Sequence, residues 1–165
     1  MFKFSPSTIV KNHVETLRDA RTDKTSFKDI VSFYVFPFIL AGIISPFSDT
    51  IYSNQLLTPV LIMGVIATIV LIQSFKNGLE LRRDTIASND SHAITLADET
   101  VHNCLYAVTV TIVFSFFLMI VGVLSISGIF SIIVNIIIIA TFAHIVLTML
   151  MVLKRIGSMY RAMFP

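Results

Sequence analysis

Charged side chains are scarce in this chain. Only 13% of its 165 residues are Asp, Glu, Lys or Arg, whereas a soluble domain carries about 25%. Hydrophobic residues make up 55%, and the mean hydropathy is +0.86. This balance excludes a disordered chain and a soluble fold. The thickness of a lipid bilayer is therefore the relevant length scale, because a membrane-spanning helix needs about 20 mainly apolar residues.

Cysteine, tryptophan and recognisable catalytic motifs are also lacking. The single cysteine, Cys104, excludes an intramolecular disulfide. The first 28 residues contain no short apolar core followed by a small-residue cleavage site, so we expect no segment to be removed. No pairing of a nucleophile with a base, phosphate-binding loop or metal constellation is visible. The sequence therefore predicts neither an enzyme nor a cofactor-binding protein.

Four long apolar runs dominate what is present. They cover about 30–47, 56–75, 105–124 and 129–153. We expect an all-α, polytopic membrane protein in which these runs are four transmembrane helices of one domain, 1–165. The first run is short and contains Pro37, which removes a backbone hydrogen bond and should act as a hinge. We expect Pro59 to open the second helix and Lys76-Asn77-Gly78 to close it.

The basic residues are segregated along the chain. All 12 Lys and Arg lie in the N-terminal segment 1–29, in a central loop 76–104 and in a tail 154–165. The two loops on the opposite side contain none. By the positive-inside rule, this pattern places both termini and the central loop in the cytoplasm.

The N-terminal segment contains an amphipathic pattern over residues 5–22. Ser5 can cap a helix there, Pro6 suits its first position, and the apolar side chains Val10, Val14 and Leu17 recur at helical spacing. Two interpretations remain open. The helix rests on the membrane surface, where its lysines and arginines meet anionic lipid, or it binds a partner protein.

The rest of the cytoplasmic surface is the second candidate for partner recognition. We expect a soluble protein, and no nucleic acid, to contact it through Arg82, Arg83, Glu99, His102, Lys154 and Arg155. Glu99 and His102 have the i, i+3 spacing that lets two ligands share one metal. A di-metal carboxylate bundle needs four such helices, however, so we favour a solvated helix start and expect no metal site.

Polar side chains inside the four runs are few, and none of them is charged. The missing carboxylate argues against a proton-coupled exporter. In the fourth run, Thr141, His144 and Thr148 share one side of the helix, whereas Asn135 projects from the opposite side. One polar side could face the chain's own spans while the other faces a second copy, which predicts a homo-oligomer. The alternative is that His144 is a neutral imidazole bonded to a nearby hydroxyl, stabilising packing by about 1 kcal/mol.

The last run, with Phe142-Ala143-His144-Ile145 near its middle and Lys154-Arg155 at its exit, resembles small four-helix proteins of bacterial phage-defence systems. These are the membrane subunit of Kiwa and the Rex membrane protein. The resemblance is one of size and topology over the second to fourth runs. It implies the bacterial inner membrane, a tetramer, and either a sensor working with a cytosolic partner or a depolarising channel.

Between these two roles, the composition favours the sensor. A permanently water-filled pore needs a charged or strongly hydroxylated stripe, which the apolar runs lack. We therefore expect a membrane sensor or anchor subunit, with an oligomeric pore as the alternative.

Overall fold

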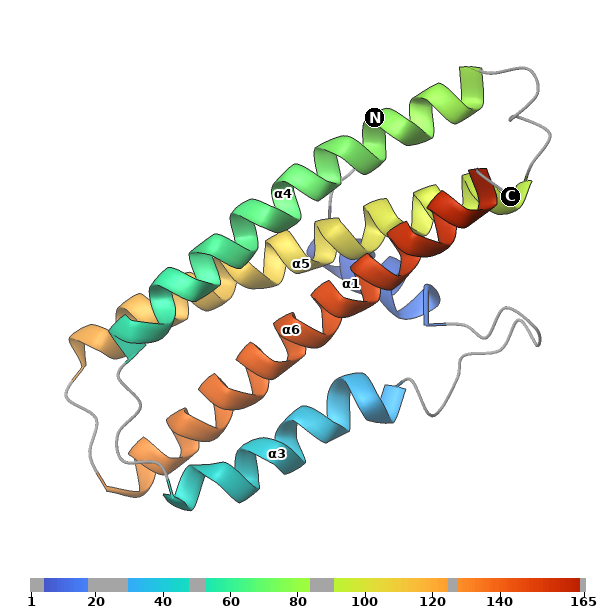
Figure 1. Cartoon of the computed structure of the whole chain (residues 1–165). Helices are drawn as coiled ribbons and strands as arrows, with labels where there is room; N and C mark the ends of the chain where they lie inside the picture. The colour runs from blue at the N-terminus through green and yellow to red at the C-terminus, as the bar shows by residue number, and fades with distance from the viewer. Residues whose placement is uncertain (1–4, 18–29, 48–52, 84–90, 125–127, 164–165) are drawn as a thin grey trace.

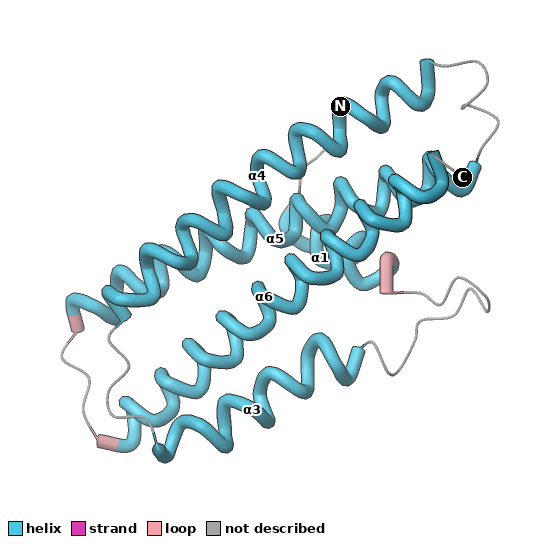
Figure 2. Tube along the Cα trace, in the orientation of Figure 1, coloured by secondary structure: helices cyan, strands magenta, loops and turns pink. Residues whose placement is uncertain are grey.

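The computed structural model describes residues 5–17, 30–47, 53–83, 91–124 and 128–163. These described residues are mostly helical, with no strand among them (Figure 2). In chain order the elements are α1 (Pro6–Glu15), the π-helical turn η1 (Val31–Val35), α3 (Phe36–Ile44), the 3-10 turn η2 (Ser45–Phe47), α4 (Ser53–Arg83), α5 (Ser91–Val123) and α6 (Ile129–Met163).

Three of these helices are long enough to cross a membrane. Helices α4, α5 and α6 have 31, 33 and 35 residues, which corresponds to lengths of about 46 to 52 Å. The hydrocarbon core of a bilayer is about 30 Å thick. Their apolar stretches, Gln55–Arg83, Ile94–Val123 and Ile129–Ser158, fit a multi-pass membrane protein. The fourth apolar helix, Val31–Ile44, is shorter.

The long helices form a bundle to which the shorter helices are added at its sides (Figure 1). Helices α4 and α5 are antiparallel neighbours, α6 packs against α5, and α3 runs beside α6. At the far end of α3, the Ser45 hydroxyl donates to the Ile132 carbonyl over 3.3 Å. Helix α1 packs against α5. The apolar core between the long helices consists of Val60, Phe114, Leu118, Ile138 and Ile145.

Small residues bring α4 and α5 into close contact. A Cβ atom added at Gly64 would lie 2.8 Å from Cγ2 of Thr111, and one added at Gly78 would lie 3.7 Å from Cβ of Ala97. Helices in membranes associate through such small residues, because they let the two backbones approach.

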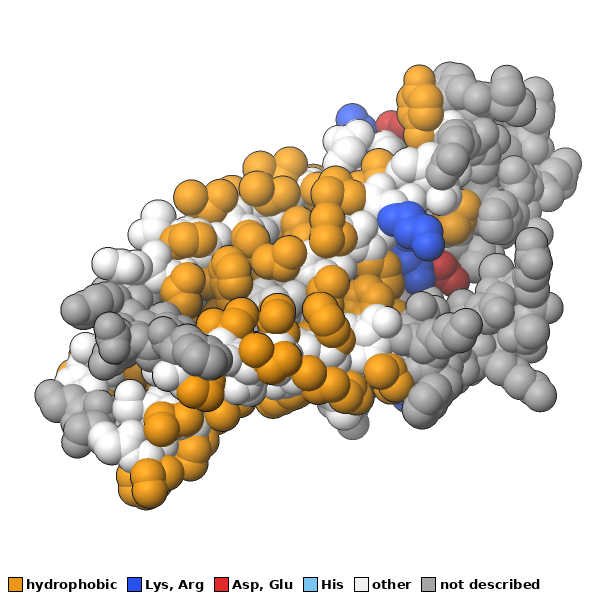
Figure 3. Space-filling model, turned by 60° about the horizontal axis from the view of Figure 1, so that its bottom comes forward, with side chains coloured by type: hydrophobic (Ala, Val, Ile, Leu, Met, Phe, Trp, Pro, Cys, Tyr) orange, Lys and Arg blue, Asp and Glu red, His pale blue; other side chains and the backbone are white. Residues whose placement is uncertain are grey.

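Most of the apolar surface faces outward. Only 11% of the most apolar window of α4 is buried inside the chain. Figure 3 shows hydrophobic side chains covering the middle of the molecule, whereas the charged side chains drawn on that face gather toward the end where α4 finishes. This apolar belt with one charged end is what a bilayer requires of a protein embedded in it.

Several expected helix ends are wrong. Pro59 lies inside α4 and does not open it. Helix α4 also continues through Lys76-Asn77-Gly78 to Arg83, because Gly78 is buried where α4 packs against α5. Most of the loop expected over 76–104 is therefore helical. Likewise, α6 continues through the expected tail to Met163.

The N-terminal helix differs from its expected form in three ways. It ends at Glu15, and residues 18–22 of the expected helix lie outside the described residues. Ser5 occupies the cap position, but its hydroxyl contacts Ser7 instead of capping a backbone amide. Val10 is 47% exposed, whereas His13 and Leu17 are buried. The helix thus packs on its own chain through a face that contains His13.

Candidate functional site

A polar cluster forms where α1, η1, α5 and α6 meet. The fully buried ring of His13 stacks on the ring of Tyr106, with 3.8 Å between centroids and 2° between planes. The Tyr106 hydroxyl lies 2.7 Å from Nε2 of His144. Nδ1 of His144 lies 2.8 Å from the carbonyl oxygen of Phe33. Three side chains thus link the N-terminal helix to the first apolar helix.

Pro37 explains why the Phe33 carbonyl accepts a bond from a side chain. In an α-helix this carbonyl would accept from the amide four residues later, and proline has no N–H. Because a carbonyl oxygen only accepts, His144 donates from Nδ1. In a neutral imidazole with its proton on Nδ1, Nε2 accepts from the Tyr106 hydroxyl, so both ring nitrogens are bonded. Phe33 itself lies within the π-helical turn Val31–Val35, directly before α3.

His13 anchors α1 to α5. Its Nδ1 donates to Oδ1 of Asn103 over 2.7 Å, and the hydroxyl of Thr16 lies 2.8 Å from the same oxygen. Burial lowers the pKa of His13 from 6.5 to about 4, although the hydrogen bond that His13 donates to Asn103 opposes the shift. The positive charge of Arg155 lowers this pKa further. Helix α1 therefore docks with His13 neutral.

The docked state leaves some polar atoms without partners. Within the described residues, Nε2 of His13, the Tyr34 hydroxyl and Nδ2 of Asn103 are buried and make no hydrogen bond. A buried unpaired polar group costs about 1 to 3 kcal/mol. The junction therefore holds α1 less firmly than an apolar contact of the same size would.

Two ion pairs brace the charged end of the bundle. Nη2 of Arg82 lies 2.7 Å from both carboxylate oxygens of Asp98, across α4 and α5. Arg155 of α6 pairs with Glu99 of α5 and also donates to the Thr16 carbonyl after α1. The Arg155 side chain is only 13% exposed. A single guanidinium thus connects α6, α5 and the end of α1.

The residues of the expected partner surface lie in different surroundings. Glu99 and Arg155 pair with each other, and their side chains are 34% and 13% exposed. Arg83 and Lys154 are exposed as expected, while Arg82 is half-exposed but paired. Nδ1 of His102 accepts a long bond of 3.4 Å from the Asn12 amide. Glu99 and His102 thus have different neighbours, and the described residues contain no group of three potential metal ligands.

The polar residues of α6 lie differently from the sequence expectation. Asn135 is 5% exposed, and Thr148 is buried and bonded to the His144 carbonyl over 2.9 Å. Thr141 and His144 border a cavity of about 250 Å³ beside Pro37. Asn135 is therefore buried by its own chain, and its side of α6 does not need a second copy to cover it. A homo-oligomer stays a prediction without that support.

Sequence reasoning missed the residues that hold α1 in place. His13 was overlooked because it lies among polar residues, although Ile9, His13 and Leu17 recur at four-residue spacing on one face. Tyr106, near the start of the third apolar run, is buried. Asn103 carries no periodic signal, so only the fold reveals it.

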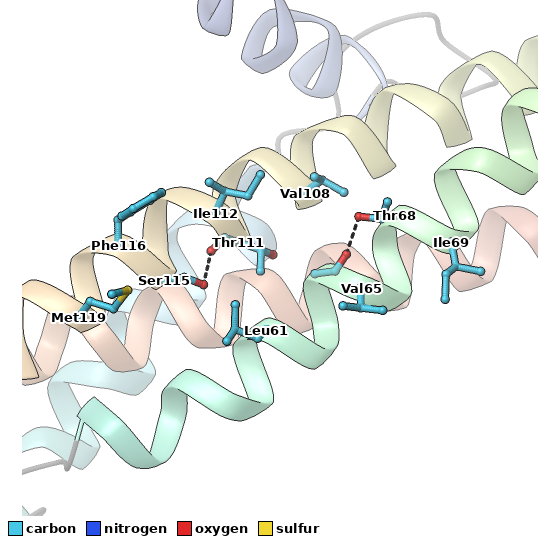
Figure 4. Close-up of a pocket in the computed structure, with 11 residues that line it drawn as sticks. Leu61, Val65, Thr68, Ile69, Val108, Thr111, Ile112, Ser115, Phe116 and Met119 are labelled. Atoms are coloured by element: carbon cyan, nitrogen blue, oxygen red, sulfur yellow. Dashed lines mark hydrogen bonds between the residues drawn. The ribbon is translucent and has the colours of Figure 1, made fainter.

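The outer groove between α4 and α5, of about 430 Å³, offers no polar path (Figure 4). Its hydroxyl side chains bond to their own helices, Thr68 to the Gly64 carbonyl and Ser115 to the Thr111 carbonyl, each over 2.8 Å. The remaining side chains that line it are apolar apart from Thr111, whose hydroxyl bonds to the Ala107 carbonyl. The groove surface is therefore suited to lipid chains or to another apolar helix.

The fold and this junction define a class: a multi-pass α-helical membrane protein with an amphipathic N-terminal helix docked on its charged end. Comparison with known proteins found no matching family, no similar curated protein and no similar solved structure.

Proposed function

We propose that this chain is a four-span membrane sensor or anchor subunit that signals to a soluble cytoplasmic protein. The observation that carries the proposal is the position of α1. It is held on the bundle by His13 and by Arg155, at the end where the exposed basic side chains gather. A helix fixed there by partly unsatisfied polar contacts is suited to changing its position.

The four-span orientation is supported by α3. Its π-helical start meets α6 at His144, and its end meets α6 at Ile132. The stretch between these contacts is about 18 Å long on each helix, so α3 follows α6 through much of a 30 Å hydrocarbon core. With α3 as the first span, all the Lys and Arg fall on one side, the cytoplasmic side by the positive-inside rule.

The partner surface that we propose consists of the exposed charges Lys11, Glu15, Arg83 and Lys154. The Arg82–Asp98 and Arg155–Glu99 pairs hold the helices that present these charges. The resemblance of Phe142–Ile145 and Lys154-Arg155 to phage-defence membrane proteins supports a place in such a system, in the bacterial inner membrane. The homo-oligomer, with four copies, rests on the same resemblance.

Charge reversal of the exposed basic residues tests the proposal. The double variant Arg83→Glu and Lys154→Glu should lose the soluble partner in co-purification from cells carrying the native operon, while its membrane insertion is unchanged. The matched control Arg83→Lys with Lys154→Arg retains both charges and should retain the partner. If the reversed variant keeps its partner and its activity, or if wild-type protein alone conducts ions in a planar bilayer, the pore alternative replaces this proposal.

A further inference from the structure

A groove of about 740 Å³ lies between α1, α4 and α5. Ile72, Phe75 and Leu105 contribute to its apolar wall, whereas Arg82, Asp98 and His102 lie at its polar part. The rise along α4 from Phe75 to Arg82 is about 10 Å. The groove therefore crosses the boundary between the apolar belt and the charged end.

Within the part of the chain that the structure describes, the polar end of this groove presents hydrogen-bond donors without a partner. Both contacts of Arg82 with Asp98 use Nη2, which leaves the three N–H groups on Nη1 and Nε of the guanidinium. Nδ1 of His102 accepts from the Asn12 amide, so a neutral imidazole carries its proton on Nε2. A phosphate group, with several acceptor oxygens, is the complement of such donors.

We propose that this groove binds one phospholipid molecule from the membrane leaflet on the basic side. Its phosphate bonds to Arg82 and His102, and one acyl chain lies along Ile72 and Phe75. Phospholipids are the amphiphiles that cross this same boundary around the protein, and their two chemically different parts match the two parts of the groove.

The charges at the polar part select the headgroup. Arg82 and Asp98 together have no net charge, so an anionic lipid such as phosphatidylglycerol brings an uncompensated charge next to a carboxylate. Phosphatidylethanolamine carries an ammonium group that can donate to Asp98. Phosphatidylcholine has no N–H on its ammonium group. The site therefore prefers phosphatidylethanolamine.

A lipid bound in this groove affects how firmly α1 is docked. Asn12 on α1 bonds to His102, and α1 itself forms one wall of the groove. A bound lipid therefore contacts both α1 and the bundle and helps to keep α1 docked. This step rests on the proposed function, in which α1 transmits a state of the membrane. It identifies the bound lipid as the ligand to which α1 responds.

Lipid binding to the purified full-length chain provides the test. After delipidation in mild detergent, native mass spectrometry measures retention of added phosphatidylethanolamine, phosphatidylglycerol or phosphatidylcholine. We expect phosphatidylethanolamine to be retained best and Arg82→Gln to weaken its binding about tenfold, as loss of a charged hydrogen bond does. The control Arg83→Gln removes the neighbouring exposed arginine and should have no effect.

A second variant keeps the test decisive if Arg82→Gln fails to fold. Ile72 is 65% exposed. Ile72→Trp should fill the apolar part of the groove with a larger side chain and weaken phosphatidylethanolamine binding by a similar factor, without touching the Arg82–Asp98 pair. Equal retention of all three lipids, or unchanged binding in Arg82→Gln and Ile72→Trp, overturns the inference. The measurement needs no partner protein, so its failure is distinct from failure of the partner experiment.

Discussion

Nδ1 of His144 lies 2.8 Å from the carbonyl oxygen of Phe33, the carbonyl whose helical donor is removed by Pro37. A carbonyl without a partner is costly in a bilayer, where no water can replace the missing amide. The histidine that appeared most unusual in the sequence thus completes the backbone of another helix. Through Tyr106 it also contacts the ring system that holds α1.

The first prediction concerns this bond. His144→Leu leaves the Phe33 carbonyl and the Tyr106 hydroxyl without partners, so we expect a loss of about 2 kcal/mol or more in the free energy of unfolding in detergent. Pro37→Ala restores a backbone N–H that can donate to the Phe33 carbonyl. His144→Leu should therefore lower the free energy of unfolding by less in the Pro37→Ala protein than in the wild type. Thermal unfolding of the wild type, the two single variants and the double variant measures this difference in stability. Equal costs in both backgrounds would refute the role of His144 as a partner for Phe33.

The second prediction concerns pH. The pKa of His13 is lowered to about 4 when α1 is docked, against about 6.5 when α1 is free. The free state binds more protons between these values, so docking is fully stable above pH 6.5 and loses up to about 3 kcal/mol as the pH falls toward 4. A nitroxide label on a cysteine placed at exposed Val10 should report increasing mobility over this range. His13→Phe retains the stacking but cannot titrate, so unchanged pH dependence in that variant would exclude His13 as the cause.

Hydropathy and charge were enough to predict the helical class and the start of α6 at Ile129. Helix ends were not predictable in the same way, because packing decides them. Asn77-Gly78 is a typical stop signal, yet Gly78 is buried where α4 packs against α5, and the helix continues through it. The polar junction was even harder to predict, since His13 and Asn103 are 90 positions apart and both are polar residues.

The third prediction concerns the contact between α4 and α5. Gly64→Ala places a Cβ atom 2.8 Å from Cγ2 of Thr111, so we expect a loss of about 1 to 3 kcal/mol. Thr111→Ser removes that methyl group and keeps the hydroxyl, so the double variant should regain most of the lost stability. Gly42→Ala is the matched control, because a Cβ atom there meets nothing within 4 Å. Equal destabilisation by Gly42→Ala and Gly64→Ala would show that close packing is not the cause.

The fourth prediction concerns orientation. If α3 is the first span, reporter fusions at positions 49 and 127 should report the outside and a fusion at position 92 the cytoplasm. The reason is that no Lys or Arg lies in the two segments that contain positions 49 and 127. An outside signal at position 92 would reverse the orientation. The same side for positions 49 and 92 would instead remove α4 as a span.

The fifth prediction concerns Arg155, whose guanidinium reaches the Glu99 carboxylate and the Thr16 carbonyl together. A lysine presents a point charge without a planar fork, so Arg155→Lys should keep the pairing with Glu99 and lose the bond to Thr16. We therefore expect Arg155→Lys to increase the mobility of a label at Val10 with little change in the unfolding of the bundle. Arg155→Leu, which strands a partly buried carboxylate, should lower the unfolding free energy by about 3 kcal/mol or more. Adding Glu99→Gln to Arg155→Leu should recover part of that loss but leave α1 mobile. If α1 stays immobile in all three variants, Arg155 braces only the bundle, and His13 alone holds the N-terminal helix.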